Sequence, residues 1–357
     1  MATGFAPALL KSMKDLAGIN YPGTKITAPG FLKMLLQNSD IMGAKLTNEQ
    51  GHQKTATVKY KQRISPSMVA TNDNCDVDFS PAFREASLTA VNTAKWGAHI
   101  SLDTVSRYME EASRGVTIGG VSVIQEVADT VTQVANALIG KVDRVLLDAV
   151  DWGKNVVYGD DFVHDLNFES DATLFDVGTG FPKLLNDAFE NEFSGDLLIC
   201  GNGIFNAVEL SKMASQAALN GIDTSRFTGY KWYADLWSKN STNWGGNDIG
   251  VFSKGSIHFV DFQKYVGFRA GKLGTSVFFQ IPIDVDGVTM LFDAQLRELD
   301  CPTSIPNIYG TSTSYDRGYV LYLTKTYGLF QVPSDAFATD DRLTGVNGAI
   351  HYNVTNS

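Results

Sequence analysis

Apolar positions are spaced most regularly between Val121 and Val150, a stretch that contains no proline. They recur there in alternating steps of three and four, which is the spacing of one face of an α-helix. A continuous helix over this stretch would be roughly 45 Å long at about 1.5 Å per residue. Glycine costs a helix interior about 1 kcal/mol relative to alanine, so we expect a bend or hinge near Gly140. The stripe reads Ile124, Val127, Val131, Val134 and Leu138, then, after a small phase shift at Gly140, Val142, Val145 and Ala149.

Shorter patterns predict the remaining elements. Alternating polar and apolar residues favour strands over 52–64 and 84–102, joined by a long turn-rich segment. A turn at Asp286-Gly287 would join two later strands. One dominant helix beside an antiparallel sheet is typical of an α+β fold. Further helices are expected over 102–114, 181–193 and from 204 onward, and further strands over 196–200, 248–253, 256–262, 276–282, 288–299, 319–326 and 327–332.

Composition places the chain among ordinary folded proteins. Its 357 residues suffice for two or three domains, with 44% hydrophobic and 19% charged residues. No apolar run reaches the roughly 20 residues of a membrane span, and the N-terminus lacks the pattern of a secretory signal. The three cysteines are widely separated and form neither a metal pair nor a disulfide framework, which favours folding inside a cell.

Charge is distributed unevenly along the chain. Residues 1–65 hold nine Lys and Arg against three Asp and Glu, a balance of +6. The rest of the chain has a balance of −16, and the two together give the net charge of −10. Six acids and no Lys or Arg lie between Lys154 and Lys183. One interpretation is that these faces are merely solvated. The other is that a basic N-terminal segment lies on an acidic surface of its own or a neighbouring chain, where complementarity sets register and association rate. An acidic body argues against sequence-specific nucleic-acid binding.

Two short motifs have a chemical reading and a structural one. Gly201-Asn202-Gly203 follows a strand and precedes a helix, as half of a dinucleotide-binding loop would, but position 206 is asparagine instead of the third glycine. A tight strand-to-helix turn explains the same residues. The segment 284–287, Asp-Val-Asp-Gly, resembles part of a calcium loop but lacks the distal glutamate, and a β-turn accounts for it.

Nothing else in the sequence indicates catalysis or a cofactor. The five histidines show no metal-ligand spacing, and neither a nucleophile elbow nor a P-loop occurs. We therefore expect no enzyme activity, no catalytic residue, no metal site and no cofactor. An aromatic cluster could line a sugar or base-stacking site, although packing of a loop-rich subdomain or a subunit contact is the favoured interpretation. Its members are Trp232, Tyr233, Trp237 and Trp244.

The order of elements resembles the major capsid proteins of tailed bacteriophages, whose Hong Kong 97-like fold is shared with encapsulins. The resemblance lies in the layout and covers nearly the whole chain. It divides the chain into an N-terminal arm (1–45), an extended β-hairpin loop (46–104), a peripheral domain with the spine helix (105–195 and 255–325) and an axial domain (196–254 and 326–357). The segment DLLICGNGIFNAVELSKMA resembles the start of the axial domain, and GVTMLFDAQLREL a long peripheral strand.

The resemblance implies a structural protein of the virion that assembles in the host cytoplasm. Its copies would form the hexamers and pentamers of an icosahedral shell around double-stranded DNA held without sequence specificity. Portal, scaffolding and decoration proteins are the further partners it implies, and a membrane is not among them. Two alternatives stay open: a soluble nucleotide-binding enzyme centred on Gly201–Gly203, and a glycan-binding or tail structural viral protein.

The charge asymmetry and this layout together predict contacts between subunits. We expect a basic set in the hairpin loop to meet an acidic set across a subunit boundary. The basic set is Lys54, Lys59, Lys61 and Arg63, and the acidic set is Asp160, Asp161, Asp165 and Glu169.

Overall fold

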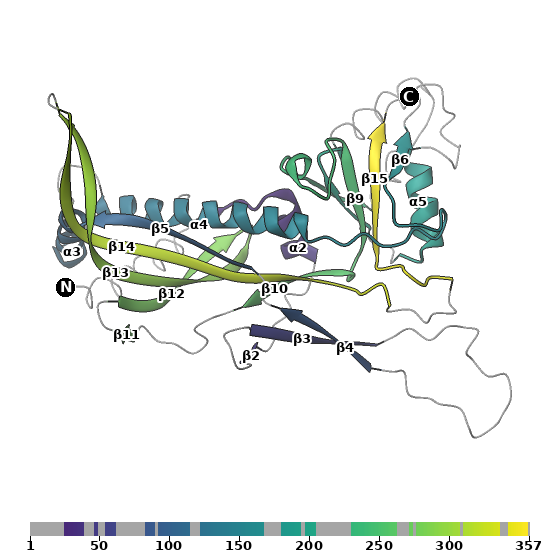
Figure 1. The fold of residues 1–357 in the computed structure, drawn as a ribbon, viewed down its shortest axis with the longest axis horizontal. Helices are drawn as coiled ribbons and strands as arrows, with labels where there is room; N and C mark the ends of the chain where they lie inside the picture. Colours follow the sequence, from purple (N-terminus) through teal and green to yellow (C-terminus); the bar gives the residue numbers. More distant parts are fainter. Residues whose placement is uncertain are drawn as a thin grey trace. The chain divides into compact units, whose positions relative to one another are not determined.

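A computed structural model describes residues 25–38, 46–48, 54–61, 83–89, 92–114, 122–167, 180–193, 197–204, 230–262, 271–273, 276–307, 310–335 and 342–355 (Figure 1). The chain divides into two compact units. Unit 1 is made of residues 1–28, 92–142 and 262–326, and unit 2 of residues 29–91, 143–261 and 327–357. The four-part division expected from the sequence stays a prediction.

Unit 1 is built around an antiparallel sheet of unusually long strands. β12 (Ser276–Val285), β13 (Val288–Asn307) and β14 (Gly310–Gln331) are consecutive neighbours. β5 (Asn92–Ser101) pairs with β14, while β1 (Lys25–Ile26) and β11 (Gly271–Leu273) pair with β12. At 20 and 22 residues, β13 and β14 far exceed the mean strand of about six. The two strands expected over 319–332 are a single strand, which begins at Gly310.

The turn between β12 and β13 forms as predicted. Asp286 and Gly287 both have positive φ, 49° and 85°, as a two-residue hairpin turn of type I′ requires. Gly287 N–H donates to Asp284 Oδ1 at 2.7 Å, and Ala28 N–H donates to Asp286 Oδ2 at 2.7 Å. Both carboxylates are therefore occupied by backbone amides, which supports the turn interpretation over the calcium loop.

Helix α4 (Val123–Asp148) lies within the span expected for it. The expected phase shift at Gly140 does not occur, because one buried face continues in steps of four from Leu138 through Val142 to Leu146. Val145 is only half-buried, since it lies one position off this face, and Ala149 lies beyond the helix and is exposed. A Cβ added at Gly140 would meet nothing within 4 Å. The hinge stays a prediction.

Helix α3 (Leu102–Arg114) forms over the span expected for it and closes the start of α4. Ser101 caps α3, because the Thr104 N–H donates to its Oγ at 3.1 Å. Glu111 of α3 is 9% exposed and accepts the Val123 N–H and the Ile124 N–H at 2.7 and 3.3 Å. A carboxylate on the first amides of a helix satisfies donors that lack intrahelical partners and complements the helix dipole.

Unit 2 contains a five-stranded mixed sheet in the order β6-β15-β9-β7-β8. These strands are β6 (His164–Asn167), β15 (Ala349–Thr355), β9 (Asp248–Ser253), β7 (Leu197–Gly201) and β8 (Tyr230–Ala234). Helix α5 (Gly180–Glu190) contacts β6, and helix α2 (Gly30–Asn38) contacts β7 and β8. β10 (Ile257–Phe262) pairs with β14. The sequence predicted β7, β9 and α5 to within a few residues but missed β15.

A separate three-stranded sheet also belongs to unit 2. β2 (Leu46–Asn48), β3 (Lys54–Lys61) and β4 (Phe83–Thr89) pair antiparallel, and within the described ranges no other strand joins them. The single strand expected over 84–102 is two strands with different partners, since β4 pairs with β3 and β5 with β14. We call β2, β3 and β4 the ribbon.

Candidate assembly surface

The chain between α4 and β6 forms a tightly held loop that presents the acidic segment. The Asn155 N–H donates to the Asp160 carbonyl at 2.7 Å, and the Gly159 N–H donates to the Asn155 carbonyl at 2.7 Å. Gly159 has φ of 81°, which favours glycine at this turn. The loop therefore has a defined shape, and its side chains are presented from a fixed backbone.

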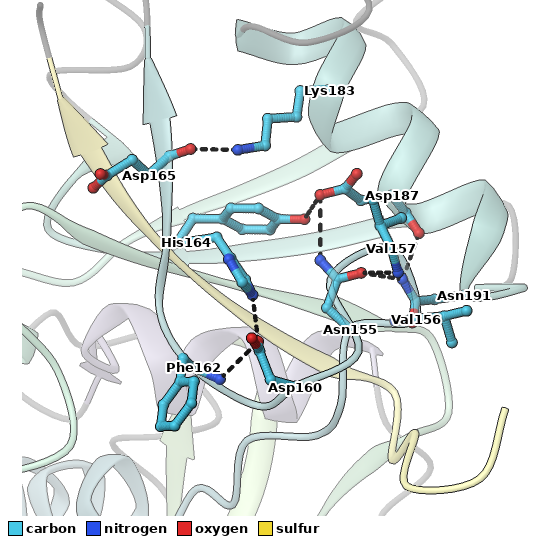
Figure 2. Close-up of polar contacts among 11 residues, drawn as sticks. Asn155, Val156, Val157, Asp160, Phe162, His164, Asp165, Lys183, Asp187 and Asn191 are labelled. Atoms are coloured by element: carbon cyan, nitrogen blue, oxygen red, sulfur yellow. Dashed lines mark hydrogen bonds and ion pairs between the residues drawn. The ribbon is translucent and has the colours of Figure 1, made fainter.

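A buried polar network ties this loop to α5 and β15 (Figure 2). Tyr352 of β15 donates to Asp187 Oδ2 at 2.6 Å, and Asn155 Nδ2 donates to the same oxygen at 3.3 Å. Asn191 Nδ2 donates to Asn155 Oδ1 at 2.9 Å, and Val156 N–H donates to Asn191 Oδ1 at 3.0 Å. Burial and then the adjacent Asp187 carboxylate raise the pKa of Tyr352, so the phenol keeps its proton and acts as a donor.

Three predicted acids lie together on this loop and its following strand. Asp161 and Asp165 are exposed, whereas Asp160 is half-buried. Asp160 Oδ1 accepts the Phe162 N–H at 3.3 Å and lies 2.9 Å from His164 Nε2. Lys183 of α5 donates to the Asp165 carbonyl at 2.5 Å (Figure 2). Asp161 and Asp165 are both exposed.

Large apolar side chains are exposed beside the acids. Phe162 is 72% exposed and points away from the polar network (Figure 2), and Phe189 of α5 is 78% exposed. Exposed aromatic residues next to polar ones are typical of protein contact surfaces. We call the following the outer apolar set: Val157, Tyr158, Phe162, Val163, Leu185 and Phe189.

The predicted basic residues lie on the ribbon or outside the described chain. Lys54, Lys59 and Lys61 belong to β3, while Arg63 and the predicted acid Glu169 lie outside the described residues. Glu85 of β4 is the register partner of Lys59, whereas Lys54 and Lys61 stand opposite Asn48 and Phe83. Opposite charges directly across a ladder attract, so Lys54 and Lys61 are the better candidates for meeting another chain. Contact between the basic and acidic sets stays a prediction.

The glycine motif at 201–203 serves packing against the start of β9. A Cβ at Gly201 would lie 2.4 Å from the Asp248 carbonyl oxygen, and one at Gly203 would lie 2.1 Å from the Asn247 carbonyl oxygen. Gly201 has φ of 141°, and the Gly203 N–H already donates to the Asp248 carbonyl at 3.0 Å. An amide engaged in this way cannot cradle a phosphate, so the geometry favours a tight turn after β7. The helix expected from 204 onward lies outside the described residues beyond Ile204.

Two members of the predicted aromatic cluster, Trp232 and Trp244, have structural roles. Trp244 is 5% exposed and donates through Nε1 to the Leu147 carbonyl at 3.0 Å, closing the end of α4. Trp232 packs against the sheet core. Trp237 is 40% exposed, with the Arg144 guanidinium 3.3 Å from its ring centroid. This arrangement favours packing over a sugar site.

The ranges described above contain neither a metal-ligating group nor a membrane-spanning helix. No group of three or more His, Cys, Asp or Glu in these ranges could hold a metal ion. No helix within them is long and apolar enough to cross a membrane.

The sequence analysis missed two helical acids that are buried in unit 2, Asp143 and Asp187, although a signal for each was present. Asp187 lies three residues after buried Leu184 on α5, and Asp143 lies three residues before buried Leu146 on α4. An acid on the apolar stripe of a helix marks a buried carboxyl that needs partners.

Comparisons with known proteins give structural neighbours only, since no protein-family model and no curated protein sequence matches the chain. One neighbour is a chain of the cyanophage A-1(L) capsid, at 12% identity, covering 92% of this chain and 94% of that one with a TM-score of 0.49. Another is a chain of the mature capsid of bacteriophage PhiM1, at 9% identity, 89% and 91% coverage and a TM-score of 0.39. A third is from the head of Helicobacter pylori bacteriophage KHP40, at 9% identity, 85% coverage of both chains and a TM-score of 0.35. These three neighbours come from phage heads and capsids.

Proposed function

We propose that this chain is a major capsid protein that self-assembles into the hexamers and pentamers of an icosahedral phage shell around double-stranded DNA. The observation that carries the proposal is the ribbon, a sheet of three strands that no other described strand joins. The proposal assigns the chain a mechanical role and requires no catalytic residue.

An isolated small sheet is a poor independent structure in water. A small sheet is independently stable only when three or more strands share a hydrophobic face or when it packs against a helix, and open edges invite pairing with another chain. β3 and β4 pair over seven residues, and from Thr55 to Lys61 the sequence of β3 alternates threonine or lysine with Ala56, Val58 and Tyr60. A neighbouring subunit would supply the missing surface, so the ribbon is suited to reach across a subunit boundary.

The long elements of the chain fit a role as a shell plate. α4 has 26 residues, or about 39 Å at 1.5 Å per residue. β13 and β14 have 20 and 22 residues, or roughly 65–75 Å at 3.3 Å per residue. An antiparallel strand pair and a helix of these lengths cover distance with few layers, as a thin shell requires.

Charge and exposed apolar surface support contacts between copies. Asp161 lies on the loop before β6 and Asp165 on β6 itself, and the outer apolar set is exposed on the same segment and on α5. Lys54 and Lys61 lie on the ribbon. We infer that the ribbon of one copy meets this acidic and apolar surface of the next. Apolar burial would supply affinity, and the charges would set register and association rate.

The wider assignments follow from the same proposal. The virion would be the site of the protein, with assembly in the host cytoplasm. Portal, scaffolding and decoration proteins would be its other partners. With a net charge of −10, the chain would enclose DNA without gripping it through many phosphate contacts.

Particle size and a charge-reversal pair test the proposal together. Purified protein should form particles tens of nanometres across by electron microscopy, at roughly the scale of a phage head. Replacing both ribbon lysines, Lys54→Glu with Lys61→Glu, should slow assembly about tenfold at low salt, measured by light scattering, because like charges then face Asp161 and Asp165. Adding Asp161→Lys and Asp165→Lys should restore the rate.

Lys239→Glu is the matched control, since it reverses an exposed lysine of unit 2 outside the proposed contact. It should assemble at the wild-type rate. A chain that stays monomeric or dimeric under all conditions would overturn the shell. Assembly with no rescue by the reversed acids would overturn only the pairing of ribbon and acidic loop.

A further inference from the structure

The N-terminus of α2 is held by two buried carboxyl groups from distant parts of unit 2. Asp143 of α4 and Asp235, which follows β8, are each 1% exposed. The Phe31 N–H donates to Asp235 Oδ2 at 2.9 Å, and the Leu32 N–H donates to Asp143 Oδ1 at 2.8 Å. Two acids therefore cap successive amides of one nine-residue helix. Sharing one helix N-terminus places both carboxyl groups in one small buried region, without the water that would screen them.

The two carboxyl groups receive unequal numbers of donors. Asp235 also accepts the Trp237 N–H and the Ser238 N–H on Oδ1, at 2.9 and 3.0 Å. Asp143 receives one amide only, and within the described part of the chain its Oδ2 is buried without a partner when the group is ionised. Three amide donors stabilise the Asp235 anion, whereas a bare buried oxygen disfavours the Asp143 anion. Protonation would convert the bare oxygen of Asp143 into a donor for Asp235.

No nearby group offers full charge compensation for a second anion. The charged or titratable side chains nearest the pair include Lys33 of α2, Arg144 of α4 and Cys200 of β7. On β8, Lys231 donates to Asn38 Oδ1 at 2.7 Å and the Tyr233 hydroxyl accepts from Asn38 Nδ2, so both bind the other end of α2. Burial, then Asp235, raise the pKa of Asp143 to about 8, while the Leu32 amide and Arg144 lower it. Burial and both acids also raise the pKa of Cys200, which stays a neutral thiol.

We propose that one proton held between Asp143 and Asp235 locks α2 onto unit 2, and that loss of this proton releases α2. The lock is independent of the proposed shell function, because every group in it belongs to one chain. α2 lies shortly before the ribbon in the sequence. Release of α2 would therefore loosen the chain that leads into the ribbon.

The direction of the pH dependence follows from the raised pKa. Docked α2 keeps the Asp143 proton up to about pH 8, whereas a released chain loses it near the ordinary value of 3.8. Docking is therefore strongest below about pH 4, weakens as the pH rises through this window, and levels off above about pH 8. A rise from about pH 6 to about pH 9 covers about two pH units of the interval between the two pKa values, since that interval ends near pH 8. The equilibrium constant for release of α2 should therefore increase by about 100-fold over this rise.

Hydrogen exchange of the full chain tests the lock. Protection of the Phe31 and Leu32 amides, corrected for intrinsic exchange, should fall by about 100-fold in the wild type across this pH range. Asp143→Asn should remove most of that fall, because its amide keeps the acceptor for Leu32, supplies a donor to Asp235 and cannot ionise. Asp148→Asn is the matched control: it neutralises an exposed acid of the same helix that also binds loop donors, and its fall should equal that of the wild type.

Infrared spectroscopy of the wild type provides a readout that does not depend on a folded variant. A protonated carboxyl band should be present near neutral pH, disappear with a midpoint near pH 8, and be absent from Asp143→Asn. Wild-type protection that does not change with pH, or a carboxyl band that is missing near neutral pH, would overturn the lock. So would an Asp143→Asn variant that keeps the wild-type pH dependence.

Discussion

Two of the carboxyl groups that unit 2 buries, Asp143 and Asp187, have opposite sets of partners. Asp187 is surrounded by neutral donors, with the Tyr352 hydroxyl at 2.6 Å and the Asn155 amide at 3.3 Å. Asp143 lies beside a second carboxyl and receives one backbone amide. Both are 1% exposed. Burial alone therefore does not set the role of an acid; the count of donors separates a structural anchor from a proton-holding site.

Removal of the Asp187 carboxyl should cause the largest loss of stability. Asp187→Ala leaves the Tyr352 hydroxyl and the Asn155 amide buried without an acceptor. Each unpaired group costs about 1–3 kcal/mol, so we expect the free energy of unfolding to fall by about 3–4 kcal/mol. Urea unfolding followed by circular dichroism measures this. A loss below about 1 kcal/mol would mean that water replaces the carboxylate, and the contrast with Asp143 would disappear.

Removal of the Tyr352 hydroxyl should lower the free energy of unfolding less than removal of the Asp187 carboxyl does. Tyr352→Phe keeps the buried ring and removes one hydrogen bond to Asp187, while Asn155 still donates to that oxygen. We expect a loss of about 1–2 kcal/mol, again from urea unfolding. Tyr327→Phe is the matched control, because Tyr327 is 1% exposed and burial alone raises its pKa, to about 12. Equal losses at the two tyrosines would show that the bond to Asp187 contributes nothing beyond burial.

Local sequence patterns predicted many of the helices and strands, but they did not predict the contacts that the buried acids make. The stripe of α4, the turn at Asp286-Gly287 and the strand β9 all depend on neighbours within a few residues, which is why spacing alone predicted them. β15 was missed although its buried residues Ile350, Tyr352 and Val354 alternate with polar residues in the sequence. The partners Asp143 and Asp235 lie far apart in sequence, and only the fold brings both to α2. The acidic loop was predicted from composition, whereas the aromatic side chains exposed beside it carry no sequence signal of exposure.

A substitution at Gly140, the predicted hinge, should change the free energy of unfolding least. It also distinguishes bending of α4 from the proton lock as the cause of the pH dependence. Gly140 lies three residues before Asp143 in α4, and a Cβ there would meet no atom within 4 Å. Gly140→Ala should therefore raise the free energy of unfolding by about 0.5–1 kcal/mol, because alanine loses less backbone entropy in a helix. Thermal and urea unfolding measure this gain, and the pH dependence of α2 protection should stay as in the wild type. A variant that is destabilised would indicate that α4 needs to bend at this position. A variant that loses the pH dependence would indicate that bending, and not the Asp143 proton, controls the docking of α2.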